Sequence, residues 1–124
     1  MCLFCEIPKE RIVNQNDLAY VIRDGFPVTN GHSLIIPKRH AVDYFSLTDV
    51  EVMACHELIC AERELAITSD STIDGFNIGL NAGESAGQTI FHCHFHLIPR
   101  RKGDVADPRG GIRHLIPGKG YYKG

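Results

Sequence analysis

The chain has 124 residues, of which 44% are hydrophobic and 23% are charged, and its formal net charge is −2. This size and balance predict a single compact domain over 1–124. No apolar run approaches the roughly 18 residues that cross a bilayer, and no basic and apolar leader opens the chain, so we expect a cytoplasmic protein with no membrane partner. Five cysteines, an odd number without the spacing of a disulfide framework, indicate free thiols or metal ligands.

Charge is distributed unevenly along the chain. From Arg100 onward seven Lys or Arg residues face two Asp, a balance of +5 that leaves −7 for 1–99. We interpret 101–124 as a basic, Gly- and Pro-rich C-terminal extension, for which phosphate binding and a solvated tail are equally good explanations. We expect no nucleic-acid partner.

Short apolar runs alternate with turn residues in the first third of the chain. The runs 12–13 and 18–22, on either side of the turn-like 14–17, predict a β-hairpin. A further short buried strand is predicted over 33–36, because this apolar run ends at Pro37.

One long helix is predicted in the middle of the chain. Thr48 and Glu51 have the spacing of a capping box, and a mostly apolar stripe of helical period continues to about Thr68. The compact apolar run 76–80 then predicts another strand, which is followed by a glycine-bearing loop over 81–88. These elements predict the α+β class, an antiparallel sheet with one main helix.

The most informative motif is a set of three histidines that alternate with apolar residues: His92-Cys93-His94-Phe95-His96. We predict a strand over 89–99, whose period of two places the three imidazoles on one face. The other face then receives Cys93, Phe95 and Leu97.

Each buried imidazole needs hydrogen-bond partners for both ring nitrogens, and an ordinary apolar core does not supply partners for three adjacent rings. The three histidines therefore indicate a functional site. Imidazole titrates near neutrality, so one ring can act as a neutral nucleophile while a neighbour donates to an anionic oxygen. Residues on the same face of a strand are about 6.6 to 7 Å apart, which places the outer rings as flanks of a phosphate at His94. The glycine-bearing stretch 83–89 offers backbone amides as an anion nest.

The histidine run together with Leu97 and Ile98 resembles the signature of the histidine triad (HIT) family. The resemblance extends over most of the chain, and the other segments that carry it are Asp24, Gly31-His32, Ile36-Pro37-Lys38-Arg39-His40, Asn81 and Gly87-Gln88-Thr89. The ending Pro99-Arg100 is similar to that of the fragile histidine triad branch, the dinucleoside polyphosphate hydrolases.

This resemblance implies a two-layer α+β protomer that forms a homodimer. It also implies an enzyme, a nucleotide hydrolase or transferase similar to bis(5'-nucleosyl)-polyphosphate hydrolases, that passes a nucleotidyl group from a covalent histidine intermediate to water or another acceptor. Substrates of this chemistry include dinucleoside polyphosphates, nucleoside phosphoramidates and adenylylated metabolites, which all offer the same α-phosphate.

Roles for individual residues follow from their positions in the family pattern. His94 is the implied nucleophile, Asp24 the residue that binds the ribose hydroxyls, and His32 a supporting histidine behind the triad. The positions that wall the base are Leu3, Phe4 and Ile22. The positions that contact phosphate are Asn81, Gly87, Gln88, Thr89 and His96.

The pair Cys2 and Cys5 has the two-residue gap of a zinc site but supplies only half of a tetrahedral shell. The zinc-bearing relatives of the family imply that His40 and His92 complete it. Four protein ligands leave no vacant position for water, so this zinc is expected to be structural. We interpret the remaining thiols as small core residues: Cys55, Cys60 and Cys93.

Two other functions remain open from the residues alone. His92 and His94 form a His-x-His pair of the kind that binds a catalytic metal, although the motif contains no Asp or Glu ligand. The second alternative, a nucleotide-binding regulatory protein, would use the same triad without turnover.

Overall fold

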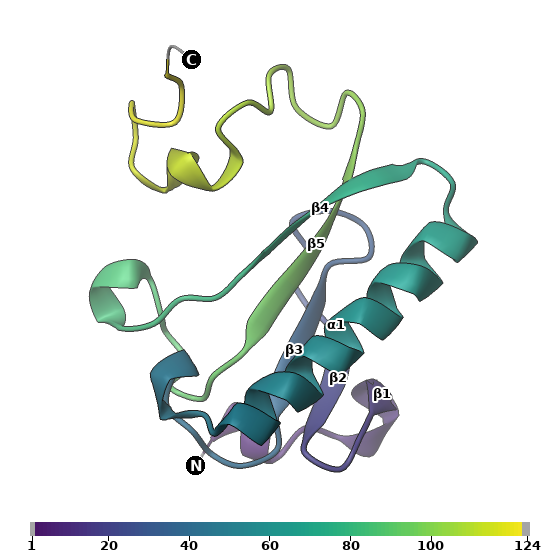
Figure 1. Ribbon diagram of the computed structural model, residues 1–124, viewed down its shortest axis with the longest axis vertical. Helices are drawn as coiled ribbons and strands as arrows, with labels where there is room; N and C mark the ends of the chain where they lie inside the picture. The colour runs from purple at the N-terminus through teal and green to yellow at the C-terminus, as the bar shows by residue number, and fades with distance from the viewer. Residues whose placement is uncertain (1, 123–124) are drawn as a thin grey trace.

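The computed structural model describes residues 2–122 and shows two layers, a sheet and one long helix laid across it (Figure 1). The sheet has five strands in the order β1-β2-β3-β5-β4, and every neighbouring pair is antiparallel. The strands are β1 (Ile12–Gln15), β2 (Ala19–Arg23), β3 (Ser33–Pro37), β4 (Ile73–Gly79) and β5 (Phe95–Arg101). The predicted α+β class is confirmed.

The helix α1 (Asp49–Ser69) begins and ends close to the predicted residues. Thr48 accepts a hydrogen bond from the Glu51 amide, and the Glu51 carboxylate accepts one from the Thr48 amide, so the predicted capping box is present. Arg39 donates two further hydrogen bonds to Glu51, which ties the segment after β3 to the helix. Within residues 2–122, none of the helices combines the length and apolar character that crossing a bilayer requires.

The predicted hairpin is present, and the side chain of Asn16 explains its turn. Its Oδ1 accepts from the amides of Leu18 and Ala19, at 3.1 and 2.9 Å, and its Nδ2 donates to the Ala54 carbonyl of α1. This Asx turn therefore also anchors the hairpin to the helix.

The predicted strand over 89–99 begins only at Phe95, so its first six residues were assigned wrongly. The amide of Cys93 donates to the Ala41 carbonyl at 2.7 Å, which lies outside the sheet. The segment bends at 90–92, but Cys93 shares the core under α1 with Phe95 and Leu97, so the predicted alternation of these three residues is confirmed. A smaller difference is that β4 begins at Ile73, three residues before the predicted run.

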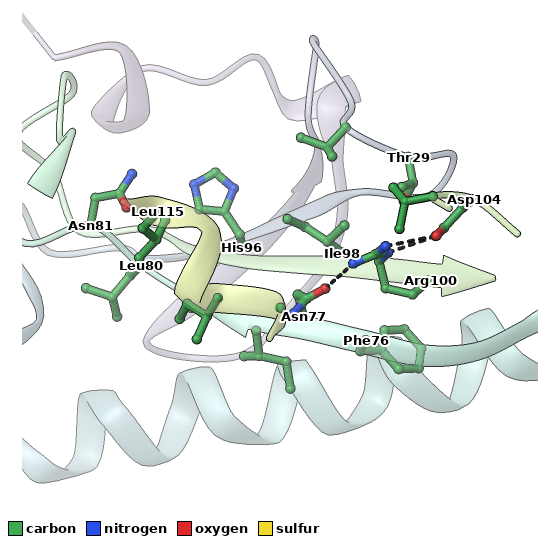
Figure 2. Close-up of a pocket in the computed structure, with 16 residues that line it drawn as sticks. Thr29, Phe76, Asn77, Leu80, Asn81, His96, Ile98, Arg100, Asp104 and Leu115 are labelled. Atoms are coloured by element: carbon green, nitrogen blue, oxygen red, sulfur yellow. Dashed lines mark hydrogen bonds and ion pairs between the residues drawn. The ribbon is translucent and has the colours of Figure 1, made fainter. Parts of the chain in front are cut away.

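A second apolar cluster lies away from the main core and contains Phe4, Tyr20, Ile22, Leu34 and Ile36. The short 3-10 helix η1 (Leu3–Cys5) brings Phe4 into it, and the Tyr20 hydroxyl donates to the Phe4 carbonyl. The other 3-10 helices are η2 (Lys9–Arg11), η3 (Tyr44–Ser46), η4 (Glu84–Ala86) and η5 (Gly111–Leu115). Figure 2 shows η5 on the side of β4 and β5 opposite to α1.

Candidate active site

The three histidines of the motif divide between two clusters. His94 and His96 lie together, with ring centroids 5.4 Å apart, and His96 Nδ1 is 2.8 Å from His32 Nε2. The Nδ1 of His92 instead lies 3.4 and 3.5 Å from the thiols of Cys2 and Cys5. The fold thus separates a pair of imidazoles suited to phosphate chemistry from one suited to a metal.

The backbone sets the proton position on His94. Its Nδ1 lies 2.8 Å from the His92 carbonyl oxygen, and because a carbonyl can only accept, Nδ1 carries the hydrogen. In the neutral ring this leaves an unprotonated Nε2, whose lone pair is available for attack. The Phe4 ring packs edge-on against His94, with centroids 5.0 Å apart, and restrains its orientation.

A chain of hydrogen bonds sets the tautomers of His32 and His96 in the same way. The amide of Val28 donates to His32 Nδ1 at 3.0 Å, so in neutral His32 the hydrogen is on Nε2, which donates to His96 Nδ1. His96 consequently carries its own hydrogen on Nε2. Burial, and less strongly the neighbouring His94 and His32, lowers the pKa of His96 to about 4. His96 is therefore a neutral hydrogen-bond donor at neutral pH.

Asp24 lies directly beside this pair, just after β2. One carboxylate oxygen accepts from the Phe26 amide at 2.8 Å, and the other is 3.4 Å from His32 Nε2. A carboxylate offers about four lone-pair positions, so it keeps the capacity to accept from ligand hydroxyls. The predicted ribose residue is thus adjacent to the histidines.

The residues predicted to wall the base differ in exposure. Leu3 is 56% exposed, whereas Phe4 and Ile22 are 5% and 1% exposed because they belong to the second apolar cluster. Of these three side chains, only that of Leu3 is therefore open to solvent.

The predicted anion nest, the loop around η4, has an internal brace. Gly83 and Gly87 have φ of 98° and 95°, in the left-handed region that favours glycine. The side-chain amide of Gln88 donates through Nε2 to the carbonyls of Val42 and Ile90, and its Oε1 accepts from the backbone amide of Gly83. Gln88 is 3% exposed, so its side chain builds the loop and does not face a phosphate.

Of the other four predicted phosphate positions, His96 lies on β5, and Asn81, Gly87 and Thr89 belong to the loop. A Cβ built on Gly87 would lie 3.9 Å from Asn81 Nδ2, so these two residues are neighbours. Thr89, after the braced glutamine, is exposed.

The four predicted zinc ligands come together. Their ligand atoms, on Cys2, Cys5, His40 and His92, all lie within 4.8 Å of one another, and three of the four S···N separations are 3.3 to 3.5 Å. A tetrahedral ion with Zn–S of about 2.3 Å and Zn–N of about 2.0 to 2.1 Å requires S···N separations of about 3.5 Å. His92 Nε2 donates to the Pro37 carbonyl at 2.7 Å, which leaves Nδ1 free to coordinate. The residues present therefore fit zinc.

His92 does not flank a phosphate as its position in the motif had suggested. It is 0% exposed, and its two ring nitrogens contact the Cys2 thiol and the Pro37 carbonyl, so it belongs to the cysteine–histidine cluster. The metal-hydrolase alternative loses support as well. Among the described residues, the two groups with metal-ligand geometry are Cys2, Cys5, His40 and His92, and Asp24, His32 and His96, and neither contains His94.

The prediction for the remaining cysteines is confirmed for two of them. Cys55 and Cys93 are 0% and 1% exposed, and burial raises the pKa of each thiol to about 12. Cys60 is exposed on α1, so its assignment to the core was wrong. The backbone groups of Pro37 and Val28 that set two tautomers could not be predicted, because such groups leave no signature in residue type.

Fold and site together define a two-layer α+β protein in which two neighbouring imidazoles, His94 and His96, are oriented by backbone and side-chain hydrogen bonds. The HIT domain family matches residues 6–103, and the chain belongs to this family. HIT proteins bind nucleotides and are nucleotide hydrolases or transferases.

Individual relatives agree with this assignment. An uncharacterized HIT-like protein of Saccharolobus solfataricus is 38% identical over 130 residues, which cover 99% of this chain and 91% of the relative. An adenylylsulfatase of Arabidopsis thaliana is 38% identical over 112 residues, 83% of this chain and 54% of the relative. A zinc-bound histidine triad family protein of Mycobacterium smegmatis has a TM-score of 0.76 at 36% identity, covering 86% and 79% of the two chains. These relatives do not single out the fragile histidine triad branch.

Proposed function

We propose that this protein transfers a nucleotidyl group from a nucleotide substrate to water or another acceptor through a covalent intermediate on His94. The observation that carries the proposal is the hydrogen bond from His94 Nδ1 to the His92 carbonyl, which leaves Nε2 unprotonated. This tautomer supports nucleophilic catalysis, because attack on phosphorus needs a free lone pair.

The reaction has two balanced halves. Nε2 of His94 attacks the α-phosphorus, the bond to the leaving group breaks, and the leaving group keeps the electron pair and takes up a proton. Water then attacks the same phosphorus, the P–N bond breaks and its electron pair returns to Nε2, and the attacking water releases one proton to solvent, which balances the proton taken up by the leaving group. Throughout, the Nε2 hydrogen of His96 donates to a phosphoryl oxygen, and His32 maintains this orientation.

The nucleotide is placed by residues around this pair. In this proposal Asp24 accepts from the ribose hydroxyls, and the base packs against Leu3, with Phe4 and Ile22 behind it. The phosphate lies at Asn81, Gly87 and Thr89, on the loop that Gln88 braces. His96 lines the same cavity as Asn81, and His32 supports it by its hydrogen bond.

Zinc belongs to the proposal as a structural ion held by Cys2, Cys5, His40 and His92. When bound it supplies a cross-link between the N-terminus and the segment before β5, and no chemistry at phosphorus. The fit of the ligand separations supports it, and the relative from Mycobacterium smegmatis is zinc-bound.

We also propose that the protein is a cytoplasmic homodimer. The outer edge of β4 is unpaired in the protomer, and Ile78 on this strand is 52% exposed, which supports pairing with a second copy. Light scattering on the purified protein measures the mass directly.

The test of the catalytic proposal is to trap the intermediate. Protein is mixed with a nucleotide labelled at the α-phosphate, denatured, and analysed for bound label. We expect label on the native protein and on His56→Ala, whose histidine is exposed on α1, and none on His94→Ala. Tight nucleotide binding without any adduct would instead favour a regulatory protein, and an adduct on His94→Ala would refute the assignment of the nucleophile.

A further inference from the structure

Glu62 is a buried carboxylate on α1, the helix that lies across β2 and β3 (Figure 1). Its side chain is 2% exposed, and its two oxygens accept from two different strands. Asn14 Nδ2 of β1 donates to Oε2 at 3.2 Å, and Arg23 Nη1 of β2 donates to Oε1 at 2.5 Å. Arg23 Nη1 also donates to Ser33 Oγ of β3 at 2.7 Å. One carboxylate of the helix is therefore linked to three strands, and we call Glu62, Arg23 and Ser33 the strand clamp.

The strand clamp lies where β2 ends and β3 begins, next to two residues of the candidate site. Arg23 and Ser33 are paired in the sheet, and one position further the Asp24 amide donates to the His32 carbonyl at 3.0 Å. Side chains of successive residues point to opposite faces of a sheet, so those of Asp24 and His32 project away from α1. There the Asp24 carboxylate is 3.4 Å from His32 Nε2. The strand clamp and the proposed ribose contact thus lie on opposite faces of the same two strands.

The loop 24–32 between these strands is attached at its middle by a different contact. Thr29 Oγ1 donates to the Pro99 carbonyl of β5 at 2.6 Å. Asp24 is at the start of the loop, directly after Arg23, whose side chain is 49% exposed. A half-exposed arginine has many rotamers, and its bond to a buried carboxylate selects one of them. The end of β2 from which the loop starts is therefore tied to the helix through Arg23.

We infer that Glu62 is a positioning residue for nucleotide binding: through Arg23 it fixes the junction of β2 and β3, so that the Asp24 carboxylate keeps its place beside His32. The inference rests on the proposed function, in which Asp24 accepts from the ribose hydroxyls. A hydrogen bond weakens steeply when its donor and acceptor leave the preferred distance and angle. Without the strand clamp, the ribose contact is therefore weakened, while the contacts to base and phosphate remain.

The test replaces the ion pair with apolar residues of similar size, in a clamp variant that carries Arg23→Met and Glu62→Leu. Such a replacement is often neutral for stability, whereas removal of one partner leaves a buried charge unpaired. Calorimetry compares adenosine 5'-monophosphate with its 2'-deoxy analogue. We expect the clamp variant to bind the ribonucleotide at least about fivefold more weakly, the lower end of what a hydrogen bond to a charged group contributes, and the deoxynucleotide as the native protein does. An equal loss for both nucleotides, or the native preference for ribose in the clamp variant, would overturn the inference.

A second ion pair on α1 provides the matched control. Glu51 is also buried and is paired with Arg39, near the start of the helix. Arg39→Met with Glu51→Gln removes this pair but keeps a glutamine at the capping-box position. The preference for the ribonucleotide should stay at its native value in this control. The same loss of preference as in the clamp variant would show that any broken helix–sheet ion pair produces the effect, and would overturn the inference.

Hydrogen exchange in the free protein separates this inference from the proposed function. The amides of Asp24 and Phe26 donate to the His32 carbonyl and to Asp24 Oδ1, so they report on the junction without any nucleotide. We expect both amides to exchange at least about tenfold faster in the clamp variant, while that of Ile35 in the centre of β3 keeps its rate. Unchanged exchange at Asp24 and Phe26 overturns the positioning role. Faster exchange at these two amides in a protein that binds both nucleotides equally upholds the strand clamp and refutes only the ribose contact.

Discussion

His96 Nδ1 and His32 Nε2 are 2.8 Å apart, and the direction of this hydrogen bond is set by a third group, the Val28 amide that occupies the other nitrogen of His32. His96 therefore presents Nε2–H beside His94. In the proposed mechanism, the donor role of His96 therefore depends on His32, which sets its tautomer.

Replacement of His32 tests this dependence. His32→Phe leaves the buried Nδ1 of His96 without its donor, which costs about 1 to 3 kcal/mol, so we expect kcat to fall roughly 5- to 150-fold with little change in KM. His32→Gln keeps an N–H donor and should restore part of the loss. A purely structural role would predict similar kcat values for both variants once folding is matched, and single-turnover kinetics with circular dichroism distinguish the two cases.

Replacement of Asp24 tests the ribose contact. Asp24→Ala should weaken nucleotide binding by about 1 to 3 kcal/mol if the carboxylate accepts from ribose hydroxyls. The matched comparison is a deoxynucleotide, which should bind the native protein more weakly than the ribonucleotide but bind Asp24→Ala equally well. Asp74→Asn, at an exposed position of β4, is the control for loss of charge. Unchanged affinity in Asp24→Ala would remove the residue from the site.

Metal analysis tests the zinc cluster. Protein purified without chelator should contain one equivalent of zinc per chain. Cys5→Ser should lose it and lower the Tm by more than about 5 °C, the shift that roughly 1 kcal/mol produces in a domain of this size. Cys60→Ser, which changes an exposed thiol on α1, should keep both the metal and the Tm. A Cys5→Ser protein that is inactive at unchanged Tm would favour a catalytic metal.

The low pKa of His96 predicts a loss of stability in acid. Its folded value of about 4 lies below the unfolded value, so the unfolded chain binds more protons between about pH 6.5 and 4. This contribution to the unfolding free energy is complete above pH 6.5 and is lost as the pH falls toward 4; about 2 kcal/mol of it is lost by pH 5. The charged or titratable groups that face the ring are His94, His32 and Asp24.

Urea unfolding at pH 7.5 and pH 5 measures this contribution. The decrease in unfolding free energy between the two values should be smaller in His96→Gln than in the native protein and in His56→Gln, whose histidine is exposed. The same decrease in all three proteins would show that His96 is not the group responsible.

Local patterns were sufficient to predict much of the architecture. The capping box of Thr48 and Glu51 and the alternation of Cys93, Phe95 and Leu97 depend on spacing within one segment, and both were confirmed. The family resemblance was sufficient to name the ligand set with His40, and the structure brings those four residues together.

Tertiary structure alone decided how the histidines are used. Cys2 and His92 are 90 positions apart, and the Pro37 carbonyl that orients His92 is 55 positions away, so spacing within the motif carries no record of either contact. Through those contacts and the hydrogen bond from Cys93 to Ala41, polar groups of the segment before β5 find partners outside the sheet. The strand therefore begins later than the motif predicts. The cavity beside His96 is likewise lined by residues of β4, β5 and the C-terminal segment, and packing between distant segments creates a space that no one segment encodes by itself.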